Sequence, residues 1–502
     1  MSERPADLWR VFEARIRGFS NALAIRSPEG ELSFGAIRSA AEHIANRLGE
    51  VGVGEGAVVG LSLSNTVDFA PALLAAFRCS ATVALISPKY RASELQAIED
   101  GINPACFVTG GAPGRHLQGE LAAIGGEVTS VPIDDTRLSV LLPRNRDSTR
   151  RLVGNPAGLS PHALIKLTSG STGVPKGIGL SASNLLAEAE NVIATLGLSH
   201  DDQILAPVPL VHSYGFDLGL LPMLFGGTSL VVRDAFVPRR ILGDLEQRET
   251  SVFLGIPSIY RTLVDIPVSV IPDLSHIRYL LSCTAPLRPE LIAAFHKKFH
   301  VPICQHYGSS ETGAVTTHSP DRVLDDPTSV GRPMRNVEVM VVDERGNEQP
   351  PNAEGEVVVS SGAVAGGYLM GAPPEESPFR DGAYWSGDLG FLNENGLLHL
   401  TGRKSEIINV GGLKVSPREV VDVLERHSAV EEAAVIGIES ASGEEIVCAI
   451  VAACGPIAAE DILAYCRDNL ADYKVPRRIE IRDELPRGAT GKVKITAGDL
   501  GL

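Results

Sequence analysis

The sequence is short of basic charge, of paired cysteines and of aromatic residues. Lysine and arginine number 45 against 61 aspartates and glutamates, so the formal net charge is −16. This acidic excess argues against nucleic acid as a partner, because nucleic acid is itself a polyanion. The seven cysteines include no C-x-x-C pair, which favours reduced thiols over disulfides or a zinc site.

Long hydrophobic runs are also missing. The N-terminal M-S-E-R-P-A-D lacks the apolar core of a signal peptide. The most apolar stretch, 217–232, is interrupted by Pro222, Gly226 and Gly227 and is too short to span a bilayer. These absences predict a cytoplasmic protein with no membrane insertion, and they leave open whether it is a monomer or a homodimer.

The 502 residues, 44% of them hydrophobic, suggest about three domains of roughly 150 residues each. Up to about residue 330, short β-branched runs alternate with helical spacing, which predicts two α/β sheets covered by helices. Helices are expected at 8–25 and 36–51. From about residue 336, short strands and turns predict a β-rich part. A tail after residue 402 should contain helices at 417–426 and 459–470.

One glycine- and hydroxyl-rich stretch, L-T-S-G-S-T-G-V-P-K-G at 167–177, has almost nothing apolar to bury. It offers backbone N–H groups, hydroxyls and the Lys176 ammonium, which together suit an oligophosphate. It is not a Walker A loop, because Pro175 precedes the lysine and Gly177 stands where Ser or Thr would ligate magnesium. The alternative is an ordinary surface loop. The nucleotide-binding interpretation therefore depends on whether other nucleotide-binding residues occur elsewhere in the chain.

Four later clusters offer such groups. Glu311, in Y-G-S-S-E-T-G, is a candidate magnesium ligand or a capping residue. Asp388, in W-S-G-D-L-G, is expected in a tight turn, where it would accept from ribose hydroxyls or from its own backbone. Arg403 and Lys404 stand at an expected domain boundary, and Lys492 lies in a glycine-rich turn near the C-terminus. Each alone is also typical of a solvated surface.

Taken together and in this order, the clusters resemble those of the acyl-adenylate-forming superfamily, which includes acyl-CoA synthetases, peptide-synthetase adenylation domains and luciferases. The similarity runs over essentially the whole chain, through T-S-G-S-T-G-V-P-K-G, P-L-V-H-S-Y-G, Y-G-S-S-E-T-G, G-E-V-V-V…G-Y-L, W-S-G-D-L-G, G-R-K-S-E and G-A-T-G-K-V. It implies a large N-terminal domain, 1–402, of two α/β sheets with a distorted β-barrel. A hinge at 403–405 and a small mobile α+β lid domain, 406–502, would follow.

The resemblance also implies the reaction. A carboxylic acid would attack the α-phosphate of ATP to give acyl-AMP and pyrophosphate, and CoA would then take the acyl group. Lys492, Thr172 and Glu311 would be catalytic, the last two as Mg²⁺ ligands. The implied ATP-binding residues are Thr168, Ser169, Gly170, Ser171, Thr172, Gly173, Lys176, Thr284, Ala285, Pro286, Tyr307, Gly308, Ser309, Ser310, Asp388, Arg403 and Lys492.

Further positions are implied in the same way. The acyl pocket would include His212, His306 and Gly308, the hinge Lys404, and the CoA channel Gly411, Gly412 and Lys414. Relatives acting on two-carbon acids carry a bulky residue at the position of Gly308, so glycine there predicts a larger acid, either a medium or long acyl chain or an aryl group. One departure, Cys283-Thr284 in place of paired glycines, could shift the adenine contacts.

The acceptor of the acyl group has two readings. The stretch I-I-N-V-G-G-L-K-V-S-P-R-E-V at 407–420 looks like the CoA-ligase version of its motif. The alternative is a free-standing adenylation enzyme that loads a phosphopantetheinyl carrier protein, and Phe216-Asp217 is similar to a pair whose aspartate grips an amino-acid amine. A non-catalytic adenylate-binding relative is disfavoured because Lys492, Glu311 and Lys176 are retained.

Overall fold

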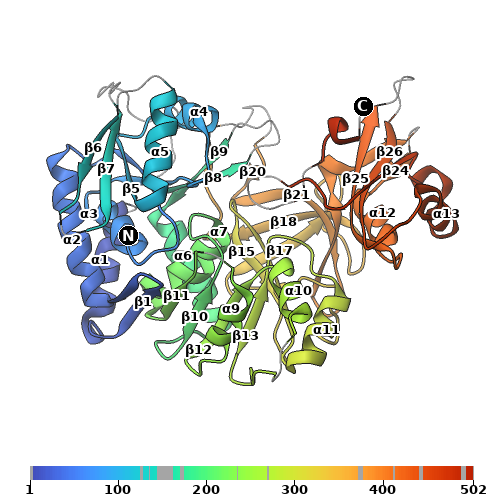
Figure 1. Ribbon diagram of the computed structural model, residues 1–502, viewed down its shortest axis with the longest axis horizontal. Coiled ribbons are helices and arrows are strands. Elements are labelled where there is room, and N and C mark those ends of the chain that lie inside the picture. The colour runs from blue at the N-terminus through green and yellow to red at the C-terminus, as the bar shows by residue number, and fades with distance from the viewer. Residues whose placement is uncertain are drawn as a thin grey trace. The chain divides into compact units, whose positions relative to one another are not determined.

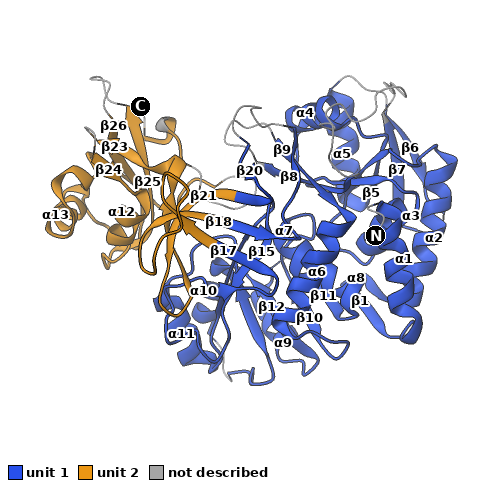
Figure 2. Ribbon diagram, turned by 180° about the vertical axis from the view of Figure 1, so that it is seen from behind, with its two compact units in different colours: residues 1–339, 359–384 blue, residues 340–358, 385–502 orange. Residues whose placement is uncertain are grey.

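The computed structural model describes residues 4–124, 128–134, 136–143, 162–169, 175–234, 236–267, 271–370, 377–410, 413–439, 445–487, 493 and 495–500. The chain forms two compact units, Met1–Val339 with Val359–Tyr384, and Met340–Val358 with Trp385–Leu502 (Figure 2). Several predicted site residues lie outside the described residues, namely Gly170, Ser171, Thr172, Gly173, Gly411, Gly412 and Lys492.

The first unit contains an eight-stranded sheet in the order β19-β9-β8-β4-β3-β5-β7-β6. Its strands β5 to β9 are labelled in Figure 1. Its strands are β3 (Val58–Ser62), β4 (Thr82–Leu85), β5 (Cys106–Gly110), β6 (Val128–Pro132), β7 (Leu138–Pro143), β8 (His162–Ser169), β9 (Pro175–Ser181) and β19 (Gly367–Met370). Its helices include α3 (Phe69–Arg78), α4 (Ala92–Ile102) and α5 (Gly111–Ala123). The parallel strands β3 and β4 are buried at every position, as expected of strands covered on both faces.

A nine-stranded sheet follows in the order β16-β15-β14-β13-β12-β10-β11-β1-β2. Its strands are β1 (Leu23–Ser27), β2 (Gly30–Ser33), β10 (Gln203–Ala206), β11 (Ser229–Val232), β12 (Thr250–Gly255), β13 (Tyr279–Ser282), β14 (Cys304–Ser309), β15 (Gly313–Thr317) and β16 (Arg332–Pro333). The accompanying helices are α2 (Phe34–Glu50), α6 (Ala182–Leu196), α7 (Ser213–Gly215), η2 (Phe216–Leu220), α8 (Leu221–Gly226), α9 (Pro238–Leu245), α10 (Pro257–Asp265) and α11 (Pro289–Phe299).

The N-terminal segment corrects one expectation. Apolar spacing predicted a helix over 8–25, but α1 ends at Arg15 (Pro5–Arg15), and η1 (Ile16–Gly18) follows it. Residues 23–27 form β1, which pairs in parallel with β11 and antiparallel with β2. The pairing partner β11 is some 200 residues away in the chain, so local spacing carries no signal of it.

The β-rich part is a five-stranded sheet in the order β17-β18-β21-β20, with β22 paired to β21. Its strands are β17 (Val337–Val342), β18 (Gly355–Ser361), β20 (Phe379–Arg380), β21 (Ala383–Leu392) and β22 (Leu398–Arg403). The boundary between the two compact units falls within β17, β18 and β21. The predicted hinge at 403–405 and the predicted domain limits at 402 and 406 remain predictions.

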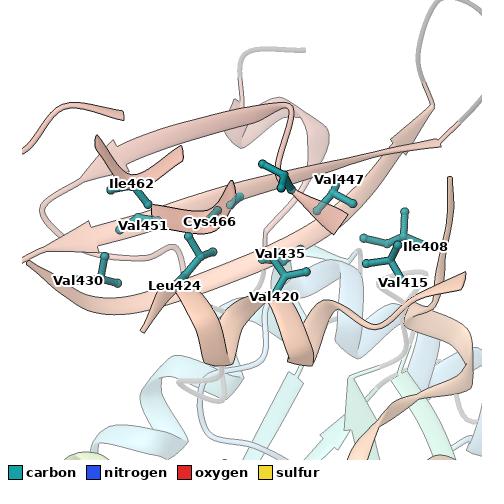
Figure 3. Close-up of a cluster of buried hydrophobic side chains, with 13 residues drawn as sticks. Ile408, Val415, Val420, Leu424, Val430, Val435, Val447, Val451, Ile462 and Cys466 are labelled. Carbon is teal, nitrogen blue, oxygen red and sulfur yellow. The ribbon is translucent and has the colours of Figure 1, made fainter. Parts of the chain in front are cut away.

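The end of the second unit has its own hydrophobic core (Figure 3). Three strands, β25 (Val430–Glu439), β26 (Glu445–Ala453) and β27 (Arg478–Arg482), form one sheet, and β23 (Ile408–Val410) pairs with β24 (Leu413–Val415). Helices α12 (Pro417–Leu424) and α13 (Ala459–Asn469) contribute Val420, Leu424, Ile462 and Cys466 to this core. The predicted tail helices are confirmed, with α12 two residues shorter than expected.

The observed architecture confirms the predicted fold class, with two large α/β sheets and a β-rich part ahead of a small α+β end. No helix in the described part of the chain is both long and apolar enough to cross a membrane. All seven cysteines are described, and none forms a disulfide.

Candidate active site

The turn between β14 and β15 carries Glu311 in the first unit. Gly308 pairs with Ala314 across this hairpin, and a bulge separates Tyr307 from Gly308. The Ser309 hydroxyl accepts hydrogen bonds of 3.2 Å from the backbone N–H groups of Glu311 and Thr312. Small hydroxyl side chains therefore close the turn, which the sequence Y-G-S-S-E-T-G supplies.

Glu311 is anchored at its side chain and at its backbone. Its Oε1 atom accepts a hydrogen bond of 3.0 Å from the Tyr368 hydroxyl, and its carbonyl accepts one of 2.8 Å from the N–H of Ala365. Within the described ranges, no three His, Cys, Asp or Glu side chains gather closely enough to hold a metal ion by themselves. One carboxylate suits Mg²⁺, which typically takes one or two carboxylates together with substrate phosphates and water.

The predicted phosphate loop starts and ends at neighbouring points of one sheet. Strands β8 and β9 run antiparallel, with Thr168 opposite Lys176 and Ser169 opposite Pro175. The Lys176 Nζ lies 5.1 Å from the centroid of the Tyr368 ring. Tyr368 thus contacts both Lys176 and Glu311. It was not predicted as a site residue, although its G-Y-L belongs to the motif series.

A buried cluster of charges lies in the same unit. The Lys166 Nζ is 2.7 Å from both carboxylate oxygens of Asp217, and the two side chains are almost wholly buried. Burial raises the pKa of Asp217, while the Lys166 charge opposes that rise. With both oxygens bound to Lys166, Asp217 is poorly placed to hold the amine of an amino-acid substrate.

Glu188, on α6, completes this cluster. Its Oε1 accepts a hydrogen bond of 2.9 Å from the N–H of Ala314, and its Oε2 has no hydrogen-bond partner among the described residues. Burial, and secondarily the charge of Asp217, raise its pKa. A Cβ at Gly313 would displace this Oε2, and the φ of +71° at Gly313 favours glycine independently. Sequence reasoning missed both Lys166 and Glu188, which look like ordinary residues of a strand and a helix.

Two histidines were predicted in the acyl pocket. His212 is half-buried at the N-terminus of α7, where its carbonyl accepts a hydrogen bond of 3.0 Å from the N–H of Phe216. His306 is buried and stacks on Tyr214, with 6.1 Å between ring centroids. Burial lowers the pKa of His306 to about 4, so this imidazole is neutral at physiological pH.

Gly308 has a packing role that sequence reasoning did not anticipate. A Cβ built on it would lie 2.4 Å from the carbonyl oxygen of Gly313. Backbone therefore fills the space that a side chain at 308 would enter directly. The expectation that the missing side chain leaves room for the acid is not supported at this point of the hairpin.

The predicted adenine-binding residues of the first unit follow two neighbouring strands. Thr284, Ala285 and Pro286 are exposed after β13, and Tyr307 is half-buried in β14. Thr284 has φ of +76°, a left-handed conformation that β-branched side chains avoid. The replacement of the paired glycines thus puts a threonine where glycine would be unstrained.

Asp388 and Arg403 lie together in the second unit. They are paired on β21 and β22, and the Arg403 Nε is 2.7 Å from Asp388 Oδ1. Asp388 lies within a strand, which corrects the tight turn that was predicted. The misleading signal is Gly387, which has φ of +71° yet remains inside β21. The Ser386 hydroxyl steadies this segment by donating to the carbonyl of Val357 at 2.7 Å.

The predicted hinge and CoA-channel lysines also belong to the second unit. The Lys404 Nζ lies 3.0 Å from Glu356 Oε2. The exposed Lys414 Nζ lies 3.0 Å from Glu344 Oε1. Both pairs are exposed on the lysine side, so each is expected to add little to stability.

Comparisons with known proteins identify the family of the chain. Residues 12–369 match the family model described as AMP-binding enzyme, and residues 419–492 match its C-terminal domain. An oxalate–CoA ligase from Arabidopsis thaliana is 32% identical over 479 residues, which cover 92% of each chain. ATP-bound MatB from Rhodopseudomonas palustris has a TM-score of 0.83 at 26% identity, over 97% of each chain.

A third similar protein is the amide bond synthetase McbA from Marinactinospora thermotolerans, with a TM-score of 0.81 and 26% identity over 97% of this chain and 98% of that one. The family match spans most of the chain, and the C-terminal match covers the end of the second unit. Both confirm the resemblance to adenylate-forming enzymes. The chain therefore belongs to the family of AMP-binding enzymes.

Proposed function

We propose that this enzyme is an AMP-forming acid–thiol ligase that uses ATP to activate a carboxylic acid and then transfers the acyl group to CoA. The observation that carries the proposal is the convergence of Glu311 and Lys176 on Tyr368, beside the strands that flank the predicted phosphate loop. A carboxylate and an ammonium that contact the same tyrosine suit a Mg²⁺-bound pyrophosphate leaving group.

In the first half-reaction a carboxylate oxygen of the acid attacks the α-phosphorus, and the bond to the β-phosphate breaks. Thr168 and Lys176 bind the β- and γ-phosphates. Glu311 and Thr172 would hold Mg²⁺, which would supply positive charge to the departing pyrophosphate. Lys492 places a positive charge where the pentavalent phosphorus forms, so its effect is greatest in the transition state.

Asp388 accepts hydrogen bonds from the ribose hydroxyls, and its short contact with Arg403 holds the carboxylate in position. Thr284, Ala285, Pro286 and Tyr307 border the adenine. In the second half-reaction the CoA sulfur attacks the acyl carbon, and AMP leaves. We assign the channel for this thiol to Gly411, Gly412 and Lys414, and the hinge between the two half-reactions to Lys404.

The acid is proposed to be larger than acetate, either a medium or long acyl chain or an aryl group. The sequence suggested this size through the glycine at position 308, where relatives for two-carbon acids carry a bulky residue. The backbone of Gly313 occupies the space next to Gly308, so room for a larger acid has to come from neighbouring side chains. His306 is one such neighbour, and as a neutral ring stacked on Tyr214 it suits an uncharged part of the acid.

CoA is the proposed acceptor, and a phosphopantetheinyl carrier protein is the alternative. The motif at 407–420 favours CoA. Occupation of Asp217 by Lys166 removes the feature that most favoured an amino-acid substrate and hence a carrier protein. Cysteines without disulfides and a need for ATP and CoA fit a reaction in the cytoplasm.

The test begins with a panel of acids, including acetate, oxalate, hexanoate, benzoate and cinnamate, assayed by ATP–pyrophosphate exchange. Exchange with at least one acid, lost in Lys492→Ala, is expected, and retention of full exchange by that variant would contradict the role of Lys492. The active acid is then offered with CoA and with a phosphopantetheinylated carrier side by side. A thioester that forms only on the carrier would overturn the CoA proposal.

A further inference from the structure

Tyr368 joins two residues that the proposed function assigns to the metal and the phosphates. Its hydroxyl is 3.0 Å from Glu311 Oε1, and the Lys176 Nζ is 5.1 Å from its ring centroid. The first partner lies in the β14–β15 turn and the second at the start of β9. A single side chain thus contacts two segments that are more than 130 residues apart in the chain.

The sheet fixes where this tyrosine stands. Strand β19 pairs antiparallel with β9, and Tyr368 lies opposite Ile178. Lys176 is two residues from Ile178 and so projects from the same face of β9, which makes it the diagonal neighbour of Tyr368. Phe379 packs edge-on against the ring at 5.3 Å between centroids, which further restricts its orientation.

The two contacts of Tyr368 differ in chemistry: the hydroxyl binds the carboxylate of Glu311, and the ring binds the ammonium of Lys176. The Tyr368 hydroxyl is the donor in its hydrogen bond with Glu311, because an ionised carboxylate can only accept. A hydrogen bond to a carboxylate is stronger than one between neutral groups. The ring face attracts the Lys176 ammonium through a cation–π contact.

We propose that Tyr368 is a positioning residue of the proposed ATP reaction, whose hydroxyl sets Glu311 for Mg²⁺ and whose ring sets Lys176 for the phosphates. The proposal rests on the proposed function for the roles of those two partners. It adds a residue that acts through them without touching the reacting atoms. Fixing the carboxylate and the ammonium before ATP arrives lowers the ordering cost of binding.

Calorimetric titration of ATP into the full-length chain, with Mg²⁺ and again with EDTA, tests the proposal. Tyr368→Phe keeps the ring and loses the hydroxyl, so the Kd for ATP with Mg²⁺ should rise about tenfold while the Kd in EDTA stays within about twofold of wild type. Tyr368→Leu also loses the ring and should weaken binding under both conditions. A Kd in Mg²⁺ that is unchanged in Tyr368→Phe, or that rises equally in EDTA, would overturn the inference.

Two comparisons exclude a merely structural effect. The Tyr384 hydroxyl lies 3.4 Å from that of Tyr368. Tyr384→Phe removes this neighbouring hydroxyl and keeps the Tyr368 hydroxyl that donates to Glu311, so it is the matched control and should bind Mg²⁺ and ATP as wild type does. In a Glu311→Gln background, Tyr368→Phe should cause no further loss of Mg²⁺-dependent binding. A full additional loss there would contradict action through Glu311.

The same measurements separate this inference from the proposed function. ATP binding needs no acid, so the Mg²⁺-selective loss in Tyr368→Phe is measurable before the acid is known. If wild type binds ATP with Mg²⁺ but supports no pyrophosphate exchange with any acid, the proposed function fails and the positioning role stands. If wild type exchanges pyrophosphate and Tyr368→Phe matches it in Mg²⁺ dependence, only the positioning role fails.

Discussion

The Lys166 Nζ lies 2.7 Å from both carboxylate oxygens of Asp217, although the two residues are 51 positions apart. Lys166 belongs to β8, which leads into the predicted phosphate loop, and Asp217 belongs to the π-helical η2. The pair therefore joins the strand before the loop to the segment that follows His212. Neither charge has access to water that would compensate for the loss of its partner.

Removing one member of this pair should destabilise the first unit severely. Lys166→Met leaves the Asp217 charge buried without a cation, at a cost of about 3–5 kcal/mol in free energy of unfolding. The double variant Lys166→Met, Asp217→Leu buries no charge at either position and should lose less stability than either single variant. Urea denaturation followed by circular dichroism measures all three, and additive losses would contradict direct coupling.

His306 should make stability depend on pH in mildly acidic solution. Its pKa is about 4 in the folded protein, against 6.5 when exposed, so the unfolded state binds the proton first. Stability from this residue is present above pH 6.5 and is lost as pH falls towards 4, by up to about 3 kcal/mol. The difference in unfolding free energy between wild type and His306→Gln should therefore shift across this range. A difference that stays constant with pH would refute the assignment.

Thr284 should be a site of backbone strain. It is the β-branched residue with positive φ among the described residues, and glycine at that position would relieve the strain. We expect Thr284→Gly to raise the free energy of unfolding by about 1 kcal/mol, because the relief exceeds the entropy cost of glycine. Thr284→Val keeps the branched Cβ and should give no gain. Thermal unfolding of both variants checks this, and equal stabilities would contradict it.

Gly308 should not tolerate even a methyl group. Gly308→Ala places a Cβ 2.4 Å from a backbone carbonyl oxygen that belongs to the same hairpin, so the backbone has to move. A loss of about 1–3 kcal/mol in free energy of unfolding is expected. Gly119→Ala is the matched control, because a Cβ there meets nothing within 4 Å in the exposed part of α5 and should be neutral or stabilising. Similar changes in unfolding free energy for the two substitutions would show that the hairpin backbone moves to accommodate the methyl group, and would contradict the prediction.

Local pattern was enough for much of the fold. The predicted helices at 36–51 and 459–470 agree with α2 and α13 to within two residues, because apolar residues spaced three and four apart share one face of a helix. The helix over 8–25 was wrong because the chain leaves the helix after Arg15 and from Leu23 forms β1, which pairs with a distant strand. The turn predicted at Asp388 was wrong because the preceding Gly387 is a typical turn residue, yet it lies inside β21.

The turn around Glu311 could be predicted because the glycine and hydroxyl residues that form it are adjacent in the sequence. The site was not predictable where chemistry depends on tertiary placement. Nothing near Lys166 in sequence indicates that Asp217 neutralises it, and nothing near Tyr368 indicates its contact with Lys176. That Lys166 binds both carboxylate oxygens of Asp217 is likewise visible only in the three-dimensional structure.

The pairing of β19 with β9 has a consequence for synthesis on the ribosome. Residues 367–370 supply the outer strand of a sheet whose other members all precede residue 182. While the nascent chain is shorter than this, the backbone N–H and C=O groups along the free edge of β9 have no strand to pair with. The first sheet therefore cannot be finished co-translationally until most of the first unit has emerged, and the intermediate carries an open edge of the kind that promotes aggregation.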